Sequence, residues 1–349
     1  MKNKLIVLLI LLLGLQFVGC SNTPTSSSED LPEEEITSKL PEGIAEIDVV
    51  IGEEYPLAGK ITYPESISEL TPAVVLVHGS GANNMDSAIG GTAIFEDLAY
   101  ELAKQGIIVI RYDKRTYTYG AQIANENFSE FTVQEETIED AVFAKEVVAN
   151  FEYTDPERIY LIGHSMGGML APIIDQQADF AGIIILAGTP RSMIDVMVSQ
   201  LNDALEQTTN SYEIKVINQN IELIESIKEM SVEEAKELNL GSMYGFYLLD
   251  FEKYDFLAAL KEIEKPILIL QGSEDFQVKV ERDYQLYVDG LNEKENVFFQ
   301  LYPGLNHLFM ISGGENQYTV AEYDAENHVT AEVIQDIVTF IKNGTLGDE

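Results

Sequence analysis

The sequence predicts an α/β fold in which a mostly parallel sheet is flanked by helices. Two observations predict it. Short continuous apolar runs, such as residues 73–77 and 182–186, are typical of strands buried on both faces. These runs alternate with segments whose apolar residues recur about every 3.6 positions, as expected for helices that cover a sheet. At 46% hydrophobic residues, the 349-residue chain can bury a full core.

The elements follow in chain order. Two opening strands are expected at 47–51 and 57–63, then a strand at 73–77, a helix at 94–104 and a strand at 107–112. A helix at 135–150 precedes a strand at 159–162, and a further helix is expected at 169–176. Three more strands are expected at 182–186, 267–270 and 297–301, with an amphipathic helix at 329–341 closing the domain.

The alternation stops for a long helical segment, which predicts a helical cap at about residues 190–262. Ligands of open α/β sheets bind outside the carboxyl ends of the strands, where such a cap would shape a pocket. A surface excursion is the alternative. The apolar stretch 243–251 either lines an acyl pocket or packs on the core. The cap's acids are spaced as on a solvated helix face: Glu222, Glu225, Glu229, Glu233 and Glu234.

The first residues do not belong to the folded domain. Lys2 and Lys4 precede an apolar run over 5–18, which has the length of a signal-peptide core and is short for a membrane span. The run ends at Phe17-Val18-Gly19-Cys20, which resembles a bacterial lipobox with Phe17 in place of the usual Leu. The resemblance implies a lipoprotein signal peptide at 1–19 and lipid attachment at Cys20. Secretion after an ordinary signal peptide is the alternative.

An acidic segment rich in Ser, Thr and Pro follows at 20–43 and predicts a tether ahead of one folded domain at 44–349. The protein is therefore expected at the outer face of the bacterial cell membrane, where the lipid anchor on Cys20 would hold it.

The chain has 21 basic and 59 acidic residues, a net charge of −38, which argues against nucleic acid as a partner. Its one cysteine excludes an internal disulfide and a Cys-rich zinc site.

The segment Gly-His-Ser-Met-Gly-Gly at 163–168 lies between a predicted strand and a predicted helix. A G-x-S-x-G pattern in that context is typical of a nucleophile elbow, in which glycines allow a strained turn that raises the serine hydroxyl. Ser165 is therefore the expected nucleophile. The Met166 N–H, at the start of the helix, is expected to face the oxyanion.

The segment His-Gly-Ser-Gly at 78–81 follows the strand at 73–77. Glycines in this place let the backbone come close to a ligand and direct N–H groups at a developing negative charge. We expect the second oxyanion donor to be the N–H of Ser80, with Gly81 as the alternative. His78 is expected to brace the loop.

The segment 272–278 follows the strand at 267–270 and offers two carboxylates, Asp275 and Glu274. A carboxylate at a strand's carboxyl end can orient a histidine and stabilise its cation. Asp275 is favoured because it lies further into the loop and before the apolar Val278.

His307 follows the last predicted strand, from which a loop can reach a serine on a neighbouring strand end. The other three histidines fit the role of general base less well. His78 belongs to a predicted brace, His164 is expected to point away from the hydroxyl, and His328 begins a helix. His307 is therefore the expected base.

The chain order Ser165, Asp275, His307 is that of the α/β-hydrolases. The chain resembles the α/β-hydrolase superfamily over about residues 45–343. It looks most like bacterial carboxylesterases related to monoacylglycerol lipases and serine aminopeptidases. The segments that carry the resemblance are VVLVHGSG (74–81), IIVIRYDKR (107–115), IGHSMGG (162–168), PILILQGSEDFQV (266–278) and YPGLNH (302–307).

The resemblance implies an α/β-hydrolase fold with a helical cap and a Ser-His-Asp triad, without a metal or organic cofactor. The predicted function is a serine carboxylesterase that hydrolyses small to medium acyl esters through an acyl-enzyme on Ser165. A serine aminopeptidase or acyltransferase with the same triad is the alternative. A substrate-binding lipoprotein with an inactive site is the third hypothesis, and the complete triad argues against it.

Overall fold

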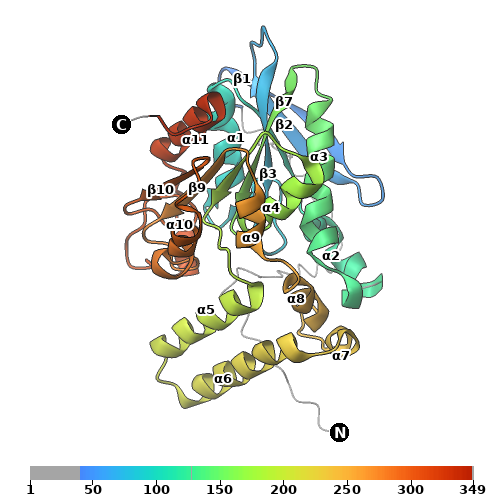
Figure 1. The fold of residues 1–349 in the computed structure, drawn as a ribbon, viewed down its shortest axis with the longest axis vertical. Helices are drawn as coiled ribbons and strands as arrows, with labels where there is room; N and C mark the ends of the chain where they lie inside the picture. Colours follow the sequence, from blue (N-terminus) through green and yellow to red (C-terminus); the bar gives the residue numbers. More distant parts are fainter. Residues whose placement is uncertain (1–39, 127, 348–349) are drawn as a thin grey trace, which may run out of the picture.

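The fold, known from a computed structural model that describes residues 40–126 and 128–347, is built on one eight-stranded sheet. Its strand order is β1-β2-β6-β3-β7-β8-β9-β10 (Figure 1). β1 (Ile44–Ile51) and β2 (Leu57–Pro64) form an antiparallel pair, and β2 also runs antiparallel to β6 (Ile108–Tyr112). The predicted signal peptide, Cys20 and the tether up to residue 39 lie outside the described residues.

The other strands of the sheet run parallel to one another, as predicted. They are β3 (Thr71–Val77), β7 (Thr154–His164), β8 (Gly182–Leu186), β9 (Ile267–Gly272) and β10 (Val297–Tyr302). Every residue of β3, β6, β8 and β9 is buried. Both faces of these strands are covered, and this is why their sequences read as continuous apolar runs.

Two hydrophobic cores cover the two faces of the sheet. Val74 and Leu76 point to the side of α1 (Ile94–Lys104) and α11 (Ala331–Asn343). Val75 and Val77 point to the opposite core, which holds residues of α3 (Glu139–Ala149), α4 (Met166–Ala178), α9 (Phe256–Glu262) and α10 (Gln285–Leu291). The predicted layered α/β arrangement is confirmed.

Several short elements were not predicted from the sequence. α2 (Arg115–Glu126) follows β6, and a 3-10 turn (Phe128–Glu130) follows α2. One π-helical turn (Gln134–Ile138) leads into α3, and another (Val280–Tyr284) leads into α10. A two-stranded hairpin, β4 (Ala88–Ile89) with β5 (Thr92–Ala93), and a 3-10 helix (Val320–Asp324) lie in loops. The first π-helical turn lies at the start of the helix predicted at 135–150, and only its π-type hydrogen bonding was not foreseen. The other pieces are short or carry few apolar residues, so their periodicity is weak.

Helices also fill the range of the predicted cap. α5 (Met193–Gln207), α6 (Ser211–Ser226), α7 (Val232–Glu237) and α8 (Gly245–Phe251), hereafter the cap helices, lie together at one end of the molecule (Figure 1). α9 lies back against α4 in the body of the domain. The five acids of the predicted solvated face are all exposed, as expected.

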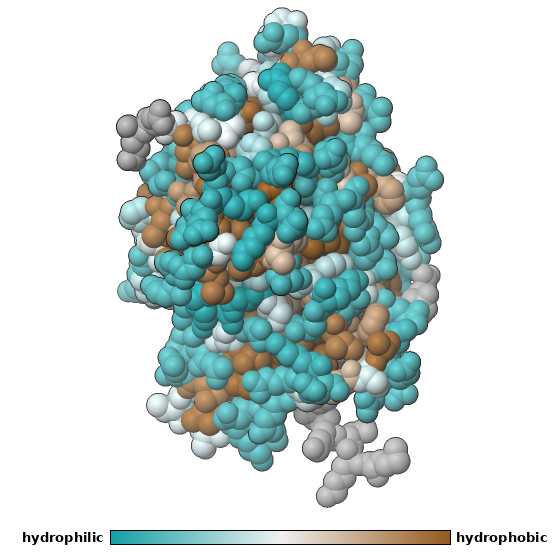
Figure 2. Space-filling view, viewed as in Figure 1, coloured by the Kyte–Doolittle hydropathy of each residue, from teal (hydrophilic) through white to brown (hydrophobic). Residues whose placement is uncertain are grey.

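The outer surface is mainly polar, in keeping with the acidic composition. Hydrophilic side chains cover most of the face shown in Figure 2, and apolar side chains gather in patches that include the cap end. Among the residues that the structure describes, no helix combines the length and apolar character that a membrane crossing requires.

Candidate active site

The turn between β7 and α4 holds Ser165 in a strained backbone conformation. Its φ is 55° and its ψ is −117°, which L-residues rarely adopt. The Ser165 N–H donates a 2.8 Å hydrogen bond to the Leu186 carbonyl on β8, so the neighbouring strand fixes the turn. Met166 is the first residue of α4, and its N–H is therefore one of the donors that a helix leaves without an internal partner.

Two glycines of the segment allow the backbone to fold this tightly. A Cβ on Gly163 would lie 2.2 Å from the Gly167 carbonyl oxygen, and a Cβ on Gly167 would lie 2.3 Å from the Val77 carbonyl oxygen. No side chain fits either space. The glycine pattern therefore reflects close contact between β3, β7 and α4, and this contact places Ser165 at the carboxyl end of the central strand β7.

The loop after β3 lies directly beside Ser165. A Cβ on Gly79 would be 3.1 Å from the Ser165 Cβ. The Asn83 side-chain amide donates hydrogen bonds of 3.0 Å and 3.2 Å to the carbonyls of Ser80 and Gly81, which hold the loop in shape. The structure thus brings both segments with predicted oxyanion donors to the same place.

His78 braces this loop, as predicted. Its Nε2 donates a 2.6 Å hydrogen bond to the Tyr112 carbonyl on β6. Burial lowers the pKa of His78 to about 3, because the interior disfavours the charged ring. His78 is therefore neutral at physiological pH.

Asp275 and His307 come together on loops that follow β9 and β10. His307 Nδ1 and Asp275 Oδ2 are 2.7 Å apart, and both residues are buried. The two loops meet closely, because a Cβ on Gly272 would lie 2.3 Å from the Leu305 carbonyl oxygen. The structure therefore brings together the predicted acid and the predicted base.

Asp275 is held by further hydrogen bonds. Its Oδ1 accepts from the N–H groups of Gln277 (2.8 Å) and Val278 (2.9 Å), and its Oδ2 accepts from the Gln271 amide at 2.9 Å. The alternative acid, Glu274, instead accepts a 2.5 Å hydrogen bond from the exposed Tyr318 hydroxyl. The contact to His307 belongs to Asp275.

His164 and His328 take up other positions. His164 Nε2 donates a 3.0 Å hydrogen bond to the His307 carbonyl, and the two rings are 4.8 Å apart. Burial lowers the pKa of His164 to about 3, so this side chain is neutral and supports the His307 loop. Sequence reasoning missed this contact, which joins residues 143 positions apart. His328 is exposed and pairs with Asp97 at 2.9 Å, as expected of a surface residue.

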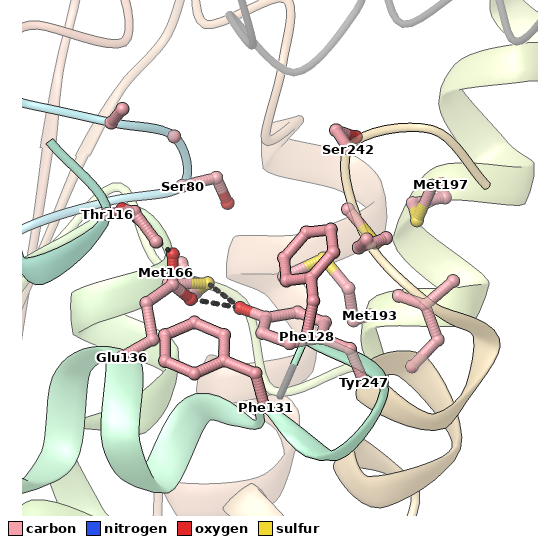
Figure 3. Close-up of a pocket in the computed structure, with 14 residues that line it drawn as sticks. Ser80, Thr116, Phe128, Phe131, Glu136, Met166, Met193, Met197, Ser242 and Tyr247 are labelled. Carbon is pink, nitrogen blue, oxygen red and sulfur yellow. Dashed lines mark hydrogen bonds between the residues drawn. The ribbon is translucent and has the colours of Figure 1, made fainter. Parts of the chain in front are cut away.

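Ser165 and His307 line one cavity of about 90 Å³, together with Ser80 and Met166. A second cavity of about 50 Å³ adjoins it and shares Ser80, Met166 and Met193. Figure 3 shows side chains from the cap helices and from the segment after α2 surrounding this second cavity. Its walls are mainly apolar, and its larger lining side chains are Phe128, Phe131, Met166, Met193, Met197, Met243, Tyr247 and Leu248.

The apolar stretch of the predicted cap is divided between a cavity wall and the core. Met243, Tyr247 and Leu248 line the second cavity, whereas Phe251 is fully buried in the core. Sequence reasoning missed Phe128, in the 3-10 turn after α2, and Phe131, just beyond that turn, because no motif marks either residue.

Comparisons with known proteins agree with this architecture. The family described as serine aminopeptidase, S33, matches residues 69–312. The esterase EstD of Thermotoga maritima is 35% identical over 303 residues, which cover 86% of this chain and 68% of that protein.

Among solved structures, Est1E from Butyrivibrio proteoclasticus is 14% identical with a TM-score of 0.53, covering 84% of this chain and 98% of its own. An esterase from Pyrococcus furiosus is 16% identical with a TM-score of 0.52, covering 93% of this chain and 98% of its own. At 14% and 16% identity, these two structures support a shared fold and nothing about the reaction. The predicted hydrolase fold and enzyme class are confirmed, and the chain belongs to the serine aminopeptidase S33 family of α/β-hydrolases.

Proposed function

We propose that the protein is a serine carboxylesterase that hydrolyses small to medium acyl esters through an acyl-enzyme on Ser165. The observation that carries the proposal is the 2.7 Å contact between His307 and Asp275 beside a cavity that His307 and Ser165 both line. The strained Ser165 turn adds support, because such strain persists where a side chain must be presented to a ligand.

The first half of the reaction forms the acyl-enzyme. With Nδ1–H donating to Asp275, His307 has Nε2 free to accept the Ser165 proton as the hydroxyl attacks the ester carbonyl. The tetrahedral oxyanion would be stabilised by the N–H groups of Ser80 and Met166, each typically worth about 10²- to 10³-fold in rate. His307 then gives the proton to the leaving alcohol.

The second half returns the free enzyme. Water enters the cavity, His307 removes one of its protons, and the resulting hydroxide adds to the acyl carbonyl. The second tetrahedral intermediate collapses, the carboxylic acid leaves, and Ser165 recovers its proton from His307.

The walls of the second cavity favour an ester over a peptide. They are mainly apolar and suit a short acyl or alcohol chain. The exposed acids of the cap segment named above lie outside the cavity lining, and the carboxylate that does line it, Glu136, is already paired with Lys114 at 3.0 Å. The relative at 35% identity is named an esterase. A serine aminopeptidase or acyltransferase remains the second candidate, on the family description.

Hydrolysis of p-nitrophenyl esters from acetate to palmitate, measured beside aminoacyl-anilides, tests the proposal. We expect ester turnover with an optimum at short to medium chains, and loss of that turnover in Ser165→Ala. Anilide cleavage without ester cleavage would transfer the protein to the peptidase class. Turnover of neither substrate set would contradict the esterase function.

We also propose that the protein is exported and anchored to the outer face of the bacterial cell membrane through two acyl chains on Cys20. The support is the sequence: Lys2, Lys4, the apolar run and the lipobox-like end. One acyl chain binds a membrane weakly and two bind stably. Full-length protein should enter the detergent phase in Triton X-114 partition, and Cys20→Ser should remain aqueous. A detergent-phase Cys20→Ser variant would contradict lipidation.

A further inference from the structure

Lys114 is a buried lysine whose ammonium group lies against the loop that carries Ser80. It follows β6 and is 1% exposed. Its Nζ donates a 2.8 Å hydrogen bond to the Gly79 carbonyl and forms a 3.0 Å ion pair with Glu136. Lysine is almost never fully buried unless it is paired, so its charge is held at this loop by specific partners.

The Gly79 carbonyl and the Ser80 N–H belong to the same peptide unit. In a planar trans peptide these two groups point in opposite directions, so a fixed carbonyl on one side fixes the N–H on the other. A hydrogen bond from an ammonium group is stronger than one from a neutral donor. It also polarises the peptide unit, and this makes the N–H on the far side a better donor.

Glu136 links Lys114 to the cap helices. The second oxygen of its carboxylate accepts a hydrogen bond from the Tyr247 hydroxyl on α8. The same hydroxyl lies 3.7 Å from the Met166 sulfur (Figure 3). The chain of contacts therefore runs from a cap helix to the peptide that carries the Ser80 N–H. It also touches the residue that carries the other predicted oxyanion donor.

We propose that Lys114 is a positioning residue for ester hydrolysis. It orients and polarises the Gly79–Ser80 peptide so that the Ser80 N–H is ready for the oxyanion, while Glu136 and Tyr247 hold Lys114 in place. The inference rests on the proposed esterase function and on Ser80 as an oxyanion donor. Lys114 itself touches neither the substrate nor Ser165 in this role.

Lys114→Met removes the charge but leaves the Glu136 carboxylate buried without its cation, which can unfold the protein. The double variant Lys114→Met/Glu136→Gln removes both charges and keeps an acceptor for Tyr247. Lys145→Met is the matched control, because Lys145 also donates to backbone carbonyls, those of Ala178 and Asp179 at the far end of α4. The readouts are kcat, KM, thermal stability and the affinity for butylboronic acid, which forms a tetrahedral adduct with the active serine.

In the double variant we expect kcat for p-nitrophenyl butyrate to fall by about 10- to 100-fold. This is less than the about 10²- to 10³-fold loss of a whole donor, because the N–H remains. KM should change by less than about twofold, and boronic acid affinity should fall in parallel with kcat. Lys145→Met should keep the wild-type kcat.

A double variant with recovered thermal stability and wild-type kcat would overturn the proposal, because the ion pair would then serve folding alone. Unchanged boronic acid affinity beside a reduced kcat would also overturn it. A wild-type protein without ester turnover would instead overturn the esterase function itself, so the two failures are distinguishable.

Discussion

Gly167 shows how closely one residue position controls the site. A Cβ there would lie 2.3 Å from the Val77 carbonyl oxygen, and backbone cannot yield as a flexible side chain can. We expect Gly167→Ala to cost about 1–3 kcal/mol of unfolding free energy, a typical overpacking penalty. Because the displaced turn carries Ser165, kcat should fall by about 10²-fold or more. Urea unfolding and steady-state kinetics check both, and a fully active variant would contradict this reading of the turn.

His78 and His164 make the fold sensitive to acid. Burial lowers both pKa values to about 3 from 6.5, so below pH 6.5 the unfolded chain binds protons that the folded protein does not. The free energy of unfolding therefore rises with pH. Between pH 6.5 and pH 3, each of the two histidines lowers it by about 1.4 kcal/mol for every pH unit of acidification.

The corresponding test replaces one histidine. In His78→Gln, the slope of the unfolding free energy between pH 4.5 and 5.5 should fall by about 1.4 kcal/mol per pH unit. His328→Gln is the control: an exposed His whose pKa is raised by Asp97 is protonated in both states over that range. An identical slope in wild type and His78→Gln would contradict a neutral buried His78.

At the scale of elements, the cap helices set the size of the second cavity. Met193 on α5 lines both cavities. Met193→Ala should open space and shift the preferred p-nitrophenyl ester to longer acyl chains, by about two to four carbons at roughly 0.8 kcal/mol per buried methylene. Met230→Ala, a cap methionine outside both linings, is the control and should keep the wild-type optimum. If the preferred acyl chain length is unchanged in Met193→Ala, the acyl chain binds outside the second cavity, contrary to this prediction.

The elements also show what the sequence can and cannot predict. β3 and β8 were predictable because burial on both faces leaves continuous apolar runs such as Val74–Val77. The placement of Ser165, Asp275 and His307 at strand ends was predictable because motif, position and chain order agree, whereas their catalytic roles stay a prediction. The Lys114–Glu136–Tyr247 contacts were not, because they join three elements far apart in the chain and no periodicity marks them.

At the scale of the whole molecule, the net charge of −38 creates self-repulsion in the compact state. Salt screens charges that lie further apart than about 10 Å at 0.1 M ionic strength. We therefore expect Tm to rise between about 10 mM and 300 mM NaCl, by about 2–4 °C for each kcal/mol of repulsion relieved. Thermal unfolding at both salt concentrations measures this, and a falling Tm would mean that favourable exposed ion pairs such as Lys104–Glu101 outweigh the repulsion.

The central claim is that Ser165, activated by His307 and Asp275, forms the covalent intermediate. Reaction with diethyl p-nitrophenyl phosphate tests it most directly, because an activated serine displaces one nitrophenolate and keeps the diethylphosphoryl group. We predict one equivalent of nitrophenolate for each chain, with the adduct located by peptide mass spectrometry on Ser165 and absent from Ser165→Ala. An adduct on another residue, or none, would contradict the claim.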